Sequence, residues 1–188
     1  MMKTLRSALL AGLALAGLTA TGHAQASAFE HKGFWLRLGL GYASAAVTCD
    51  GCSGPRENGL GGGLSLGGTI NPHFQLGFES SAWSKSEDGV TLSIGTGTLS
   101  GYFYPGAKRR LYLKAGLGVA FSVANEGSSS VTHTGPGGIL GLGYDVPVSR
   151  KVALSPYASW NYGSLGSQSG VGTLHENTFQ VGLGLTFE

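Results

Sequence analysis

The two cysteines of this 188-residue sequence lie close together, in the stretch Cys49-Asp50-Gly51-Cys52. A CxxC pair can form a disulfide, carry out thiol redox chemistry or bind a metal. Thioredoxin-like redox chemistry needs a βαβ context, which the surrounding sequence lacks. The start of the chain indicates export, as described below, so we expect Cys49 and Cys52 to form a small disulfide within a loop.

Two histidines extend the possible metal chemistry of this pair. His133 and His175 lie in or beside polar segments that could meet the two thiolates at one end of the molecule. The spacing of these four residues is not that of a zinc motif. The sequence therefore predicts no metal and no cofactor, and Cys49, Cys52, His133 and His175 stay weak metal candidates only.

The polar segments also hold the residue types of a hydrolase. A serine hydrolase needs a serine activated by histidine, with an acid to orient the histidine. Ser128 to Ser130, His133, Glu126 and the pair His175-Glu176 supply these types. Serines and histidines in polar loops are more often simply solvated, so no residue is assigned to catalysis.

Eight segments with alternating apolar residues make up most of the chain and must position these groups. A strict period of two is typical of strands with one apolar face. The clearest example is the last segment, where Phe179, Val181 and Leu185 share one face and Gln180 lies on the other. The segments are Phe34–Ala43, Leu60–Ile70, Phe74–Trp83, Val90–Tyr104, Leu111–Val123, Gly137–Val146, Val152–Tyr162 and Thr178–Phe187.

Two segments depart from the regular pattern. In Val90–Tyr104 the apolar phase changes between Ile94 and Leu99, which predicts a β-bulge that resets the register. In Val152–Tyr162, Pro156 cannot donate a ladder hydrogen bond, which predicts a second local bulge.

The connections alternate between short turns and longer loops. Short turns follow Ile70, Tyr104 and Val146, whereas long loops are expected around Cys49, Glu87, Ser129 and Ser167. Outer-membrane barrels have an even strand count, short periplasmic turns and longer external loops. The pattern predicts an all-β fold, an eight-stranded antiparallel up-and-down transmembrane barrel.

The N-terminal residues predict the cellular location. Met1 to Ala24 combine a basic start, an apolar run and a small-residue cleavage site, which is typical of a secretory signal peptide. Residues 25–188 then form the barrel domain. Without Lys3 and Arg6 the formal charge is zero, which argues against a nucleic-acid partner.

Several stretches resemble the small eight-stranded outer-membrane barrels of OmpA/OmpX type. The resemblance covers Gly33 to Phe187 and is carried by YFYP at Tyr102, LYLKAGLGV at Leu111, GLGYDVPV at Gly141 and NTFQVGLGLTF at Asn177. It implies an outer-membrane location, a monomer surrounded by lipid, and recognition of the last strand by the barrel-assembly machinery. Phe187 matches the terminal aromatic of the family's assembly signal, and Glu188 adds one charged residue after it.

Four charged residues fall on the phase opposite to the apolar face. They are Arg37, Glu79, Lys114 and Asp145. A Lys or Arg on the lipid face near the midplane costs about 2–4 kcal/mol, so we expect all four inside the barrel. Unpaired buried charge is costly, so we expect the four to pair. Lys114 and Asp145 lie on neighbouring strands, and we expect Arg37 to reach Glu79 across the small inward residues of the strand between them.

The resulting prediction is a plugged barrel with a structural or surface-interaction role in the cell envelope. One alternative is a lipid-modifying barrel enzyme, although His133-Thr134-Gly135 has glycine where a deacylase-like pattern has serine. The other is a soluble, lipocalin-like ligand carrier, which would have an apolar interior and a polar outside.

Overall fold

The computed structural model describes residues 30–49, 52–87, 90–106, 109–126, 129–168 and 172–188. The predicted signal peptide, Met1 to Ala24, lies outside the described residues. Within the described ranges, none of the chain forms a helix with the length and hydropathy needed to cross a membrane.

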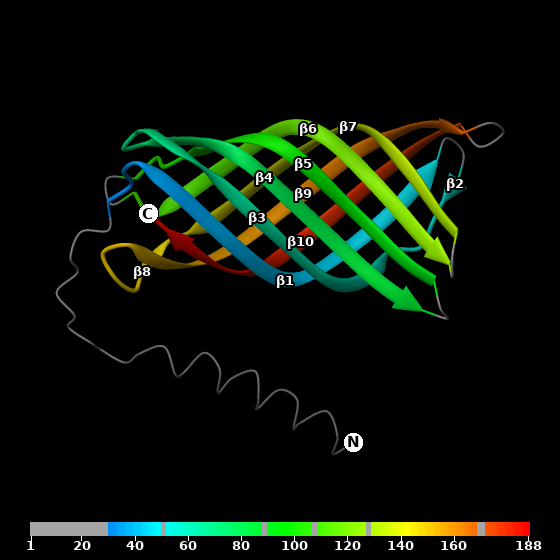
Figure 1. Ribbon diagram of the computed structural model, residues 1–188, viewed down its shortest axis with the longest axis horizontal. Coiled ribbons are helices and arrows are strands. Elements are labelled where there is room, and N and C mark those ends of the chain that lie inside the picture. The colour runs from blue at the N-terminus through cyan, green and yellow to red at the C-terminus, as the bar shows by residue number, and fades with distance from the viewer. Residues whose placement is uncertain (1–29, 50–51, 88–89, 107–108, 127–128, 169–171) are drawn as a thin grey trace, which may run out of the picture.

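Eight long antiparallel strands form the molecule, and two short strands accompany them (Figure 1). The long strands are β1 (Phe34–Cys49), β3 (Glu57–Asn71), β4 (Phe74–Glu87), β5 (Val90–Phe103), β6 (Leu111–Glu126), β7 (Ser129–Tyr144), β9 (Val152–Gln168) and β10 (Gly172–Phe187), and the short ones are β2 (Cys52–Ser53) and β8 (Val146–Pro147).

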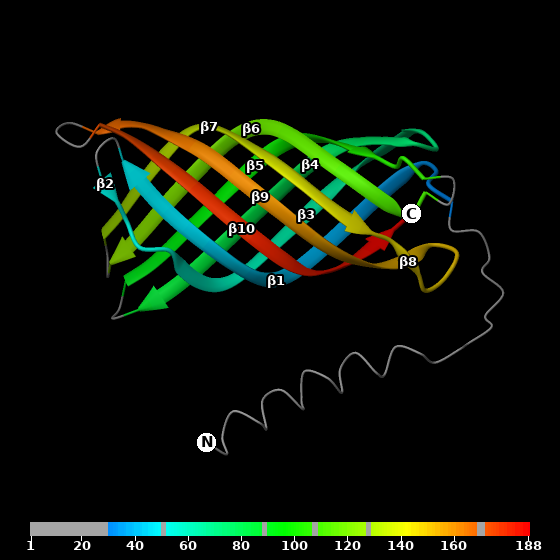
Figure 2. The same cartoon turned by 180° about the vertical axis from the view of Figure 1, so that it is seen from behind.

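The sheet closes on itself. Each long strand pairs with its sequence neighbours, and β10 pairs with both β9 and β1. Figure 2 shows this seam from behind, with β10 beside β1. The predicted all-β, eight-stranded antiparallel barrel is therefore confirmed.

The two ends of the barrel differ. The chain enters β1 and leaves β10 at the same end, where the connections between β3 and β4 and between β5 and β6 also lie (Figure 1). We call this the short-turn end, and the opposite one, where β1, β4, β6 and β9 finish, the hairpin end.

The two faces of the sheet follow the predicted alternation. On β10, Val181, Leu183 and Leu185 are exposed, whereas Gln180 and Thr186 are buried inside. Apolar side chains thus cover the outside and polar ones line the interior, which is the arrangement of a membrane barrel. It is the reverse of the apolar interior that a lipocalin-like carrier needs.

Outward aromatic side chains mark a level near the hairpin end. Tyr42 of β1, Trp160 and Tyr162 of β9, and Phe179 of β10 are all exposed. Aromatic rings of this kind gather at membrane–water interfaces. The strand residues beyond this level therefore lie outside the lipid-facing band.

The strands run farther past this level than predicted. The segments around Cys49, Glu87, Ser129 and Ser167 were expected to be long loops, but most of their residues continue the ladders of paired strands. The prediction of long loops is wrong because it relied on apolar alternation. Outside lipid, a paired strand needs no apolar face, since backbone hydrogen bonds hold the hairpin.

The bulge predicted in Val90–Tyr104 is wrong. β5 pairs with β4 and β6 without a register shift along its whole length. The apolar phase changes because Ile94 points inward and packs with Trp83, Ala43 and Ala45, with Leu92 beside them. One side of the interior near the hairpin end is therefore apolar, while the strand itself stays regular.

Pro156 also causes no bulge. It pairs in register with Leu183 of β10. On its other side, the ladder with β7 ends at Gly143 and resumes in β8 at Val146. The missing N–H of Pro156 thus falls opposite a gap in the neighbouring ladder, so the strand needs no extra residue.

Candidate functional site in the barrel lumen

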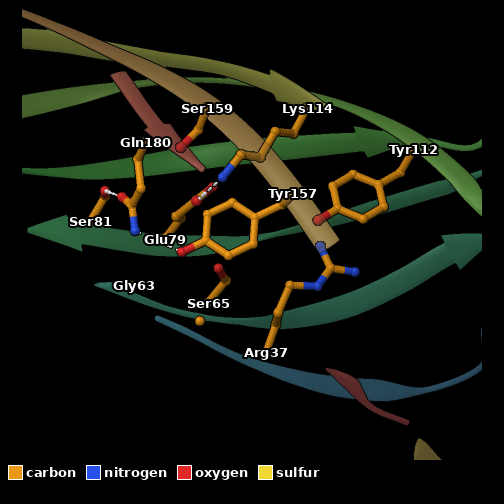
Figure 3. A pocket seen from close by; sticks show the side chains of 11 residues that line it. Arg37, Gly63, Ser65, Glu79, Ser81, Tyr112, Lys114, Tyr157, Ser159 and Gln180 are labelled. Carbon is orange, nitrogen blue, oxygen red and sulfur yellow. Dashed lines mark hydrogen bonds and ion pairs between the residues drawn. The ribbon is translucent and has the colours of Figure 1, made fainter. Parts of the chain in front are cut away.

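The four strand charges meet inside the barrel in two ion pairs. Arg37, Glu79, Lys114 and Asp145 are 6%, 6%, 8% and 0% exposed. The Arg37 guanidinium lies 3.5 Å from the Asp145 carboxylate. The Lys114 ammonium pairs directly with Glu79 (Figure 3).

These pairs differ from those predicted. The sequence matched Lys114 with Asp145 on the neighbouring strand and Arg37 with Glu79 across one strand, but the structure exchanges the partners. Lys114 reaches from β6 past β5 to β4, because the tilt of barrel strands brings residues of non-adjacent strands to one level. The lumen is narrow enough for a lysine side chain to cross this distance.

Aromatic rings enclose the Arg37 guanidinium. Its central carbon lies 4.3 Å from the ring centroid of Tyr112, 4.9 Å from that of Tyr102 and 5.7 Å from that of Trp35. A cation over an aromatic face is attracted by the ring quadrupole, more strongly when both are desolvated. Together with Tyr104, these rings form a buried cluster near the short-turn end.

Hydrogen bonds connect the rings to the two carboxylates. Tyr102 donates to Glu79 at 2.8 Å, and Tyr104 donates to Asp145 at 3.0 Å. Ser155 donates to the other oxygen of Asp145 at 2.5 Å. Each buried acid thus has a cation and at least one hydroxyl donor, which offsets the cost of its burial.

Little space is left between these groups. The cavity beside the ion pairs has a volume of about 20 Å³, and Arg37, Lys114, Glu79, Tyr157 and Gln180 are among its lining residues (Figure 3). A volume of this size holds about one water molecule.

A second polar layer lies farther toward the hairpin end. Gln180 donates to the Tyr157 hydroxyl at 2.6 Å and accepts from Ser81 at 3.3 Å. Asn161 donates to Ser81 at 3.1 Å. The lumen is therefore crossed twice, first by ion pairs and then by neutral hydrogen bonds.

Glu188 closes the short-turn end from the other side. Its carboxylate accepts from Gln75 Nε2 at 2.7 Å and lies 2.7 Å from His31 Nδ1. The side chains of His31 and Glu188 are almost fully buried, and His31 Nε2 lies 2.8 Å from the Arg109 carbonyl. The charged residue after Phe187 thus ties the end of β10 to the segment before β1.

We expect Glu188→Ala to destabilise the barrel by about 1–3 kcal/mol, because His31 and Gln75 would lose their shared acceptor while remaining buried. The change is measured as a shift in the urea midpoint of the folded form in detergent micelles. Glu30→Ala is the control, because Glu30 pairs with Lys32 on the exposed surface. An equal midpoint shift in both variants would contradict this role of Glu188.

The remaining candidate residues are not gathered in one place. Cys49 is disulfide-bonded, and its register partner is Cys52 of β2. His133 lies opposite Ser122 on the inward phase of β7, whereas His175 lies on the outward phase of β10 and stacks on Tyr162. Among the described residues, no three His, Cys, Asp or Glu side chains are grouped to hold a metal.

Some of the candidate hydrolase residues lie outside the part of the chain that the structure describes. Ser128 and the side chains of Glu126 and Ser129 lie outside the described parts of the chain. Ser130 is exposed near the tip of the hairpin formed by β6 and β7.

The interpretation of the sequence missed the aromatic rings around Arg37. Trp35, Tyr102 and Tyr112 sit on the polar phase of their strands, next to the outward residues Phe34, Phe103 and Leu111. A signal was present, since a large aromatic on the polar phase of a narrow barrel must fill the lumen.

Comparison with known proteins agrees with this geometry. The family model described as the outer membrane protein beta-barrel domain matches residues 11–187. No curated protein sequence matches the chain.

Two solved structures illustrate the likeness. Neisserial surface protein A is 17% identical, with a TM-score of 0.56, over 83% of this chain and 97% of its own. Ail, the attachment invasion locus protein of Yersinia pestis, is 16% identical, with a TM-score of 0.57, over 82% of this chain and 99% of its own; it was solved in complex with the heparin analogue sucrose octasulfate. At these identities the likeness establishes the fold alone.

Proposed function

Because the chain belongs to the outer membrane protein β-barrel family, we propose that it is a plugged barrel that serves the cell envelope as a structural and surface-interaction element rather than as a pore. The observation that carries this proposal is the filled lumen. Two ion pairs and an aromatic cluster cross the interior, and the cavity beside them has about 20 Å³. Hydrated solutes need a continuous path much wider than one water molecule.

The proposal includes the surroundings of the barrel. Export through Met1 to Ala24, recognition of β10 by the assembly machinery, and a monomer surrounded by outer-membrane lipid follow the family pattern. The exposed apolar residues of β10 support the lipid contact, since Val181, Leu183 and Leu185 form an uninterrupted outward row.

Planar-bilayer recording tests the plug. We expect the folded barrel to give no steady conductance, because desolvated ion pairs block the lumen. The double variant Arg37→Ser, Tyr112→Ser should open detectable channels, because it removes the guanidinium and a ring that fill the short-turn end. Glu87→Gln is the matched control, because Glu87 is exposed at the hairpin end and pairs there with Lys85.

A heat-modifiability gel shift must first show that each protein is folded. Steady conductance of the unaltered barrel at modest voltage would refute the plugged lumen. Silence of the folded double variant would show that the layer of Gln180, Tyr157 and Asn161 closes the lumen without Arg37 and Tyr112.

The surface-interaction part of the proposal rests on the hairpins beyond the aromatic level. Ail was solved with the heparin analogue sucrose octasulfate, an anion that basic side chains attract. Here Arg56 is bonded to the Ser44 carbonyl and to Asn177, and Lys85 is paired with Glu57 and Glu87. Lys85 is thus neutralised by two carboxylates, so we propose that its hairpin does not serve to bind a sulfated chain.

A further inference from the structure

The short-turn end of the barrel carries a group of basic residues, which we call the basic cluster. Its described members are Lys32 before β1, Arg109 and Arg110 before β6, and Arg150 and Lys151 before β9. Lys32, Arg150 and Lys151 are exposed, and the two others are half-buried. The C-terminus and β8 lie at the same end (Figure 1).

Few acids offset the charge of the basic cluster. Among the described residues of this end, Glu30 is the one exposed acid, because Glu188 and Asp145 are buried. Glu30 pairs with Lys32 at 2.5 Å. The other four members of the cluster form no ion pair with any carboxylate of the described chain.

The hairpin end has a different balance of charge. Lys85 there pairs with Glu57 and Glu87, which are both on the surface. Arg56 is held by hydrogen bonds to the Ser44 carbonyl and to Asn177. Within the described ranges, the basic groups that lack such partners are therefore concentrated at the short-turn end.

Hydrogen bonds through two buried residues join the segments of the basic cluster. His31 precedes Lys32 in the chain, and its Nε2 lies 2.8 Å from the Arg109 carbonyl. Its Nδ1 lies 2.7 Å from the Glu188 carboxylate. The Glu188 amide in turn donates to the Lys151 carbonyl at 3.0 Å. Three segments that are far apart in the sequence are thus fixed side by side, so their cations form one surface before any ligand binds.

Outward apolar residues continue directly from the basic cluster. Phe34 and Leu111, which follow it on β1 and β6, are 65% and 41% exposed. Val148 is 69% exposed in the turn that also carries Arg150 and Lys151. Cations beside a lipid-facing apolar surface lie at the level of the lipid headgroups, where their stems cover apolar surface and their charged ends reach phosphate.

We propose that the basic cluster binds the anionic headgroups of phospholipids, such as phosphatidylglycerol, in the leaflet at the short-turn end. A soluble anionic polymer would use the cations but would gain nothing from the exposed apolar residues beside them. The inference rests on the lipid-surrounded barrel proposed above, and it adds a headgroup preference to that environment.

The test uses the folded barrel in phosphatidylcholine bilayers that contain a trace of spin-labelled phosphatidylglycerol or spin-labelled phosphatidylcholine. The ratio of the two association constants gives the headgroup preference. The variant Arg150→Gln, Lys151→Gln removes two charges and leaves the backbone hydrogen bonds of this turn in place. A triple variant adds Arg110→Gln. Arg56→Gln, Lys85→Gln is the matched control, because it removes two charges from the hairpin end.

We expect the unaltered barrel and the control to prefer phosphatidylglycerol by about fivefold, which is the effect of one Lys or Arg near an anionic membrane surface. The preference should fall stepwise in the double and triple variants. Added salt should reduce it in the unaltered barrel, because exposed charges are screened.

Equal association of both lipids with the unaltered barrel would overturn the proposal, as would an equal loss of preference in the control and the double variant. Binding of soluble polyglutamate by the barrel in micelles, without a preference for phosphatidylglycerol, would assign the cluster to a soluble anionic partner instead. The gel shift shows whether each protein folds in phosphatidylcholine alone. A barrel that folds there without a headgroup preference refutes only this inference, whereas a chain that folds in no bilayer refutes the lipid-surrounded barrel itself.

Discussion

Lys114→Ala is expected to destabilise the folded barrel by about 3–5 kcal/mol. Lys114 is buried and pairs with Glu79, whose other oxygen accepts from Tyr102 at 2.8 Å. Removing the ammonium leaves a carboxylate in the lumen with one hydroxyl donor and no cation. The free energy of unfolding, from urea titration read by the heat-modifiability gel shift, measures the loss.

The double variant Lys114→Met, Glu79→Leu separates the cost of an unpaired charge from the value of the pair. Replacing a whole buried pair with apolar residues is often nearly neutral, so the double variant should recover most of the stability. The remaining loss reflects the Tyr102 hydroxyl, which would lack its acceptor. If the single and double variants are equally unstable, the loss comes from packing rather than charge.

Raising the pH from about 5 to about 9 should weaken the barrel through Glu176, a buried carboxyl near the hairpin end of β10, by on the order of 4 kcal/mol. The folded-state pKa is about 8 and the ordinary value is 4.5. Because the folded pKa is raised, this stabilisation is complete below about pH 4.5 and is lost as the pH rises through about 8. Above that value the folded state must hold a buried, charged carboxylate.

Glu176→Gln isolates this contribution. The variant and the unaltered protein should be similarly stable at about pH 5, whereas the variant should be the more stable of the two at about pH 9. Glu87→Gln controls for general effects of charge, because Lys85 lowers the pKa of Glu87 on the exposed surface. A stability difference between Glu176→Gln and the unaltered protein that does not change with pH would refute the assignment.

Strand alternation predicted the fold because it reflects the two environments that a barrel wall separates. On strands such as β6 and β10, lipid on one side and a narrow, largely polar interior on the other impose opposite side-chain polarity over most of the lipid-facing length. The same logic placed Arg37, Glu79, Lys114 and Asp145 on the inward phase, where the structure has them buried. It needed no knowledge of which strand lies across the lumen.

The partners within the lumen could not be predicted in the same way. Sequence gives the order of strands, and hence neighbours such as Lys114 and Asp145, but side chains that meet inside a tilted barrel come from strands farther apart. The inward position of Ile94 was not predicted either. An apolar residue can face the interior as well as lipid, so the apolar phase alone does not say to which side it points. The contacts of Glu188 could not be predicted, because it lies after Phe187, where the alternating pattern of the last strand ends.

The ion pair between Arg37 and Asp145 affects how the barrel assembles. Arg37 stands on β1, near the start of the folded chain, and its partner Asp145 lies between β7 and β8. A growing, open sheet would hold these charges apart, and only the meeting of the first and last strands brings them together. Partly joined sheets therefore lack the attraction that the finished cylinder gains, so ring closure and charge neutralisation become one cooperative step.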